Sequence, residues 1–158
     1  PRLGEIQAML DSPALALIFG ALLTAIVQSS SVVSGLAVIA VADELLVPSV
    51  AVWMVAGANI GTTSTALLAS SALDNFSRRL ALLNTASILL GVLLFATVLQ
   101  PVIAMILASG FSPSQQVAIV HTVFNLSATI AALLIIPHVW PKISRWLHKD
   151  QVNHPART

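Results

Sequence analysis

The sequence predicts an all-α, polytopic integral membrane protein, and two observations support this prediction. Hydrophobic residues make up 57% of the chain and charged residues only 8%, whereas about a quarter of the residues of a soluble domain are charged. The charged residues also leave long gaps, and the last gap, between Arg79 and Lys142, has room for two crossings of about 20 residues each. A soluble protein of this length could not keep such an apolar surface in solution.

Composition excludes several other classes of protein. The net charge of +1 provides no basic surface for nucleic acid. The absence of cysteine excludes disulfides, thiolate metal sites and a cysteine nucleophile. No signal-peptide pattern follows Pro1. Because the chain starts abruptly and without Met, we expect it to be part of a longer polypeptide.

The N-terminal part of the chain is expected to form two short helices separated by a polar break. Residues 1–11 mix charged and apolar side chains and predict a short interfacial segment. Pro13 favours a helix start, because proline is tolerated in the first turn. The helix should reach about Val27, where the polar residues 28–31 interrupt the apolar pattern before a second apolar piece, 32–42. Neither piece can span a membrane alone, so together they fit one interrupted helix or a re-entrant hairpin.

A second break of similar shape is expected in the next helix. Asp43 and Glu44 predict a turn, and Pro48 predicts the start of the helix that follows. The polar, Gly-flanked segment 57–65 then divides this helix into two halves, the second of which ends near Leu73.

The C-terminal half predicts two full-length spans, residues 78–99 and 114–136, within a terminal helical region 78–137. They are joined by a short apolar helix, 101–109, that does not cross the membrane. Pro137 is expected to end the second span, because proline interrupts the backbone hydrogen bonds of a helix. The remaining residues, 142–158, predict a polar, basic tail.

Basic residues predict the orientation. Arg78 and Arg79 begin the first long span, and Lys142 and Arg145 follow the second. Two crossings between the clusters put both on one side, which the positive-inside bias assigns to the cytoplasm. The tryptophans beside the second cluster suit the membrane interface.

The two polar breaks predict a binding site at the middle of the bilayer. Backbone that leaves a helix inside a membrane is tolerated where it lines a cavity or is covered by protein. Half-helix N-termini bind anions, and unwound carbonyls with hydroxyls bind hard cations. The neutral polar groups available at the breaks belong to Ser29, Ser30, Ser31, Asn59, Thr62 and Thr63. The alternative interpretation is that these small polar residues only pack helices together.

A weaker candidate site is the pair His121 and Asn125, which lie four residues apart on one helix face. A single histidine on an apolar helix is usually an interhelical hydrogen-bonding contact, and the other interpretation is a role in substrate or proton binding.

The two motifs together resemble the type II sodium–phosphate cotransporter family, including its bacterial members. That family carries QSSS followed by G-[AS]-N-I-G-T-[ST], once in each of two inverted repeats. In this chain the motifs are Gln28-Ser29-Ser30-Ser31 and Gly57-Ala58-Asn59-Ile60-Gly61-Thr62-Thr63. The spacing also agrees, and the resemblance covers about residues 13–141.

A third segment extends the resemblance to the C-terminal half of such a transporter. His121-Thr122-Val123-Phe124-Asn125 resembles the H-x-x-F-N segment near the end of the second repeat of bacterial members. An earlier H-x-x-F-N, frequent in the family after the paired arginines, is replaced here by Asn84-Thr85-Ala86-Ser87-Ile88. The resemblance therefore supports no role for that earlier histidine.

The resemblance implies sodium-coupled transport of inorganic phosphate across the plasma membrane, the inner membrane in a bacterium, rather than an enzyme. Na⁺ would be the coupling ion, with no organic cofactor. Residues 1–141 would form one inverted-repeat unit, with residues 142–158 as a cytoplasmic tail. Phosphate is expected at Gln28, Ser29, Ser30, Ser31, Asn59, Gly61, Thr62 and Thr63. Na⁺ is expected at Ser29, Asn59, Thr62 and Thr63, with His121 and Asn125 as a possible secondary site.

By the family's architecture the substrate path lies between two repeats, so a second repeat is an expected partner, beside phosphate and the lipid bilayer. It would come from the same longer polypeptide or from an inverted homodimer.

Two other functions are compatible with the sequence. An intramembrane serine hydrolase or protease could use a serine from 29–31 with His121, although the G-x-S-x-G elbow that positions such a nucleophile is missing. A non-transporting membrane scaffold could use the small residues for packing alone. Labelling by a fluorophosphonate would distinguish the first alternative, and phosphate counterflow would distinguish the second.

Overall fold

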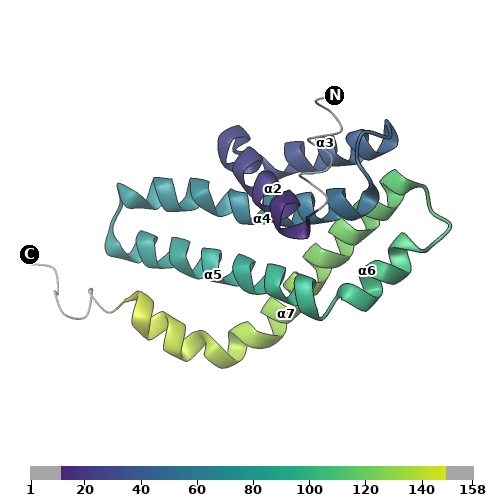
Figure 1. The fold of residues 1–158 in the computed structure, drawn as a ribbon. Coiled ribbons are helices and arrows are strands. Elements are labelled where there is room, and N and C mark those ends of the chain that lie inside the picture. Colours follow the sequence, from purple (N-terminus) through teal and green to yellow (C-terminus); the bar gives the residue numbers. More distant parts are fainter. Residues whose placement is uncertain (1–11, 149–158) are drawn as a thin grey trace, which may run out of the picture.

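The computed structural model describes residues 12–148, and this part of the chain is all helical (Figure 1). Its helices are α2 (Pro13–Val27), α3 (Ser30–Ala42), α4 (Pro48–Ser71), α5 (Asn75–Thr97), α6 (Gln100–Leu107) and α7 (Pro113–Leu147). Three of them, α4, α5 and α7, are long and apolar enough to cross a membrane. The predicted all-α membrane fold is thus confirmed, whereas the predicted interfacial segment 1–11 and the end of the tail lie outside the described residues.

The first predicted break is present, between α2 and α3. Gln28 ends α2 in the left-handed region, with φ of 58°, and its backbone N–H donates to the carbonyl of Thr24 at 2.6 Å. Ser29 is extended and begins α3, where its Oγ accepts a hydrogen bond from the Val32 N–H at 3.4 Å. The chain reverses here, so that α3 does not continue in the direction of α2 (Figure 1).

The second predicted break is wrong, because α4 is one continuous helix from Pro48 to Ser71. Its glycines serve close packing instead. A Cβ on Gly57 would lie 1.9 Å from the carbonyl oxygen of Leu17, and one on Gly61 would lie 2.4 Å from that of Ala21. Gly57 and Gly61 are four residues apart and thus on one face of α4. They let the backbones of α2 and α4 touch, as small residues do in membrane helix pairs.

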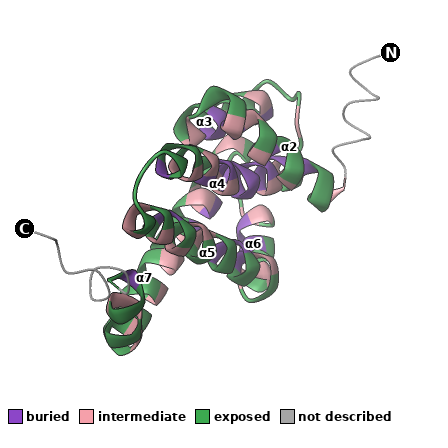
Figure 2. Ribbon diagram, turned by 90° about the vertical axis from the view of Figure 1, so that its left-hand side faces the viewer, coloured by how far each residue is buried: buried purple, intermediate pink, exposed green. Residues whose placement is uncertain are grey.

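Helix α4 is the central helix of the described fold. It packs against α2, α3, α5 and α7, and buried residues concentrate along it (Figure 2). Beside it, the Phe95 ring of α5 meets Trp53 and Phe124 edge to face, at centroid distances of 5.6 and 5.3 Å. Such aromatic pairs stabilise a packed core beyond the area they bury.

Helix α7 is longer than predicted, because Pro137 does not end it. A capping box of Ser112 and Gln115 starts the helix, which runs to Leu147 with Pro137 and Pro141 inside it. Each proline removes one backbone hydrogen bond and pushes the helix to bend, and α7 is visibly bent in its last third (Figure 1). The predicted tail therefore begins as helix.

The two basic clusters meet in the fold, which agrees with their predicted location on one side of the membrane. The Arg79 guanidinium donates to the carbonyls of Trp146 and Leu147, at 2.8 and 3.2 Å. The start of α5 and the end of α7 therefore lie at the same level. The turn at Gly110, between α6 and α7, lies at the other end of both helices.

The orientation predicts the labelling of single cysteines at residues 78 and 110. In the full polypeptide made free of other cysteines, Gly110→Cys should react with an impermeant maleimide in intact cells. Arg78→Cys should react only after permeabilisation, because the positive-inside bias puts it in the cytoplasm. Space around Gly110 is open, so the new side chain fits there. Labelling of residue 78 from outside and of residue 110 only after permeabilisation would mean that the orientation is reversed.

Candidate ion-binding site

The break between α2 and α3 offers hydrogen-bond donors. The backbone N–H groups and hydroxyls of Ser30 and Ser31 make no hydrogen bond within residues 12–148. They lie in the first turn of α3, where the helix dipole is positive. The side chain of Gln28 is exposed beside them. Unpaired N–H and O–H groups at a helix N-terminus are suited to an anion.

The second motif offers acceptors. The Asn59 amide donates to the carbonyl of Val55 at 3.0 Å, Thr62 Oγ1 donates to Ala58 at 3.1 Å, and Thr63 Oγ1 donates to Ile60 at 2.8 Å. Each threonine hydroxyl thus uses its hydrogen on its own helix, and its oxygen keeps lone pairs. Oxygen lone pairs are the ligands that hard cations prefer.

The two motifs are joined through Thr24. A Cβ on Gly61 would lie 2.6 Å from the Cβ of Thr24, and the Thr24 carbonyl accepts the hydrogen bond from Gln28 that ends α2. Gly61 therefore packs one helical turn before the break. The motifs make no direct side-chain hydrogen bond to each other in the described part of the chain.

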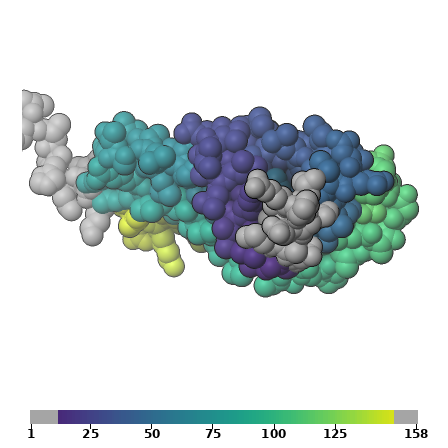
Figure 3. Space-filling model, turned by 45° about the horizontal axis from the view of Figure 1, so that its top comes forward, coloured from purple at the N-terminus to yellow at the C-terminus, as the bar shows by residue number. Residues whose placement is uncertain are grey.

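The site is open on one side. Gln28, Ser31 and Thr62 are exposed, Asn59 is half-buried, and Thr63 is buried. Figure 3 shows α2 and α3 at the surface of the molecule, beside the end of α4. No cluster of three or more His, Asp or Glu side chains capable of holding a metal occurs in residues 12–148. The motif residues named here, Gln28, Ser31, Asn59, Thr62 and Thr63, are all neutral.

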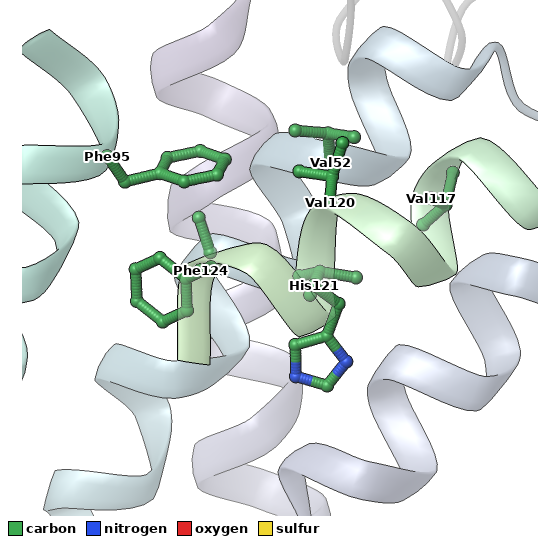
Figure 4. A pocket seen from close by; sticks show the side chains of 8 residues that line it. Val52, Phe95, Val117, Val120, His121 and Phe124 are labelled. Atoms are coloured by element: carbon green, nitrogen blue, oxygen red, sulfur yellow. The ribbon is translucent and has the colours of Figure 1, made fainter. Parts of the chain in front are cut away.

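His121 lies away from the serines. It lines a narrow apolar pocket between α4, α5 and α7, together with Val55 and Phe124, and its ring points away from Phe95 (Figure 4). The ring makes no hydrogen bond in the described region. The Asn125 amide donates to the His121 backbone carbonyl at 2.9 Å. Among residues 12–148, His121 thus forms neither the expected interhelical hydrogen bond nor a serine–histidine hydrogen bond of the kind that a serine hydrolase would use.

Two buried hydroxyls were not predicted. Thr24 is fully buried and Ser34 is nearly so, and neither hydroxyl has a hydrogen-bond partner within residues 12–148. The sequence contains a signal for Thr24, because Ala16, Gly20 and Thr24 recur every four residues and form one small-residue face of α2. That face packs on the glycines of α4.

Comparison with known proteins identifies the family. The family model described as Na⁺/Pi-cotransporter matches residues 4–137. The chain is also 31% identical over 127 residues to the uncharacterized protein YqeW of Bacillus subtilis strain 168. The match covers 80% of this chain and 40% of that relative, so the chain spans about two fifths of the relative's length. No solved structure matches the chain. With the family model matching most of its length, the chain belongs to the Na⁺/Pi-cotransporter family, a family of membrane transporters.

Proposed function

We propose that this chain is one repeat of a sodium-coupled transporter of inorganic phosphate. The observation that supports the proposal most is the match to the Na⁺/Pi-cotransporter family, and the two motifs add two complementary sets of polar groups. Within the described residues, free donors stand at the N-terminus of α3, and α4 carries hydroxyl oxygens with free lone pairs. One set suits an anion and the other suits a hard cation.

The proposed roles follow from this chemistry. Ser30 and Ser31 would bind phosphate oxygens through their amides and hydroxyls, with Gln28 at the open side. Asn59, Thr62 and Thr63 would provide oxygens to Na⁺, and Ser29 would complete this set from the break. Gly61 would act by position, because any side chain there would push α4 away from α2.

A second repeat is required in this proposal. The exposed side of the site needs a cover, because an ion bound there would otherwise face lipid or bulk water. The greater length of the Bacillus relative favours a second repeat in the same polypeptide over an inverted homodimer. We further propose a bacterial inner membrane location with the end of α7 in the cytoplasm, from the basic residues that meet there.

Substitutions at the site should impair exchange of phosphate. In proteoliposomes containing the full polypeptide, Ser30→Ala and Asn59→Ala should each weaken the apparent affinity in counterflow of radioactive phosphate by roughly tenfold or more. The reason is that a lost partner in a buried polar site costs about 1–3 kcal/mol. Ser87→Ala is the matched control, because Ser87 is exposed on α5 and bonds only to the carbonyl of Leu83. Unchanged kinetics in both site variants would mean that phosphate binds elsewhere. Absence of counterflow in the unsubstituted protein would favour the scaffold alternative.

A further inference from the structure

Helix α7 is longer than one membrane crossing requires. Residues 113–136 already provide roughly 36 Å of helix at 1.5 Å per residue, which exceeds the hydrocarbon thickness of about 30 Å. Pro137 follows at once, and the helix bends and continues to Leu147 (Figure 1). The segment after Pro137, here called the terminal segment of α7 (residues 138–147), therefore lies at the membrane boundary.

The terminal segment has an apolar face that the protein covers. Leu147 is 4% exposed, and Ile143, four residues earlier on the same face, is half-buried. The Arg79 guanidinium of α5 lies over the Trp146 ring, 5.5 Å from its centroid. It also donates to the carbonyls of Trp146 and Leu147, so it caps the negative end of the helix. These contacts fix the terminal segment against the start of α5.

The opposite face is basic and open. His138, Lys142 and Arg145 recur at intervals of four and three residues and are all exposed. The Lys142 ammonium has no partner within the described residues. Arg145 uses only its Nε, which donates to the carbonyl of Pro141 at 3.0 Å, and its two terminal nitrogen groups remain available. The contacts of the apolar face therefore direct these charges away from the protein.

Within residues 12–148, no acidic side chain neutralises this face. The terminal segment contains no Asp or Glu. At this end of the described fold the carboxylate is that of Asp74, which accepts a hydrogen bond from the Ser77 N–H at 2.9 Å and caps α5. Hydrogen bonds from the Ser77 side chain and backbone lower the pKa of Asp74. The Asp74 carboxylate therefore interacts with the start of α5 and not with the basic face of the terminal segment.

We propose that the basic face of the terminal segment binds the headgroup phosphates of anionic phospholipids. The segment lies at the depth of the headgroups, and Trp140, which is 53% exposed, has the amphipathic ring that membrane interfaces favour. A helix with a basic face and aromatic residues at this depth attracts an anionic leaflet. A dissolved anion could bind basic residues at any level, whereas a lipid phosphate is found only at the level of the headgroups. The position of the segment therefore favours a lipid.

The test is native mass spectrometry of the purified full polypeptide in neutral detergent. Phosphatidylglycerol and phosphatidylcholine of the same chain length are titrated, and the ratio of their affinities is measured. The unsubstituted protein should prefer phosphatidylglycerol, and Lys142→Gln with Arg145→Gln should reduce the preference by roughly 25-fold, about fivefold for each cation. Lys142→Arg with Arg145→Lys keeps the charge and should keep the preference.

Three outcomes would overturn the proposal: equal affinity for the two lipids, an unchanged preference in the doubly neutralised variant, or loss of bound phosphatidylglycerol when inorganic phosphate is added at constant ionic strength. If the double variant does not fold, the lipid preference is measured for Lys142→Gln alone. The Lys142 ammonium has no partner within the described residues, so this variant should fold, and a fivefold loss of preference is expected. None of these outcomes depends on transport, so the lipid site and the proposed function can fail separately.

Discussion

Gly57→Ala should strongly destabilise the protein, although it adds only one methyl group to a helix. The new Cβ would lie 1.9 Å from the carbonyl oxygen of Leu17, 2.7 Å from its carbonyl carbon and 2.9 Å from its Cα. These are backbone atoms, so no side chain can rotate away, and α2 and α4 must separate. Gly20 makes the reciprocal contact, since its Cβ would lie 1.9 Å from the carbonyl oxygen of Met54.

The expected loss is at the upper end of overpacking effects, about 3 kcal/mol or more, and thus roughly 5 °C or more in the melting temperature in detergent. Gly35→Ala is the matched control, because Gly35 also lies in a helix but has open space around its Cβ position. Alanine favours helix over glycine by up to about 1 kcal/mol, so this control should melt at the same temperature or slightly higher. Equal melting temperatures for Gly57→Ala and the control would mean that α2 and α4 are not in contact through these glycines.

The first break could be predicted from the sequence because its residues act locally. Ser29 caps α3 with its own side chain, and Gln28 adopts the left-handed conformation that ends many helices. The apolar pattern stops at the same residues, so pattern and capping agree. The two long spans, α5 and α7, could be predicted for a similar reason, because each contains a long uncharged stretch.

The second break could not be judged from the sequence, because glycine supports two different structures. It permits an unwound backbone, and it also permits two helices to touch. Only the position of α2 decides between these, and that position depends on residues about forty places earlier in the chain, such as Leu17 and Ala21. The same dependence explains why the contact between Gly61 and Thr24 was not predicted.

The predicted end of α7 at Pro137 is wrong, although proline usually interrupts a helix. The helix continues through Pro137 and Pro141 because tertiary contacts hold its last turn, above all the hydrogen bonds from Arg79. Those contacts join residues 67 and 68 positions apart, which no local pattern reveals. The candidate site residues themselves remain a prediction from the motifs.

Phosphate binding should depend strongly on sodium, because residues 12–77, which contain both motifs, offer the anion no formal positive charge. Near neutral pH phosphate carries one to two negative charges, and moving a charge out of water costs several kcal/mol even after relaxation. Between residues 12 and 77 the chain has no Lys or Arg, and its charged residues there are Asp43, Glu44 and Asp74. The dipole of α3 supplies about half a charge at the break, which does not neutralise a dianion.

Bound Na⁺ can supply the missing charge. Thr62 and Thr63 follow Gly61, which packs against α2 one turn before the break, and the hydrogens of their hydroxyls are already used on α4. Cations held there would attract the anion at the N-terminus of α3. Thermodynamic linkage then requires that phosphate strengthen Na⁺ binding by the same factor by which Na⁺ strengthens phosphate binding.

Calorimetric titration of phosphate into the full polypeptide, in sodium and in choline buffers of equal ionic strength, tests sodium-coupled phosphate binding most directly. We expect binding to be at least tenfold tighter in sodium, about 1.4 kcal/mol or more, and we expect Na⁺ to bind more tightly by the same factor when phosphate is present. Equal phosphate affinity in the two buffers would contradict sodium coupling, and the anion would then have to be neutralised by a group other than Na⁺.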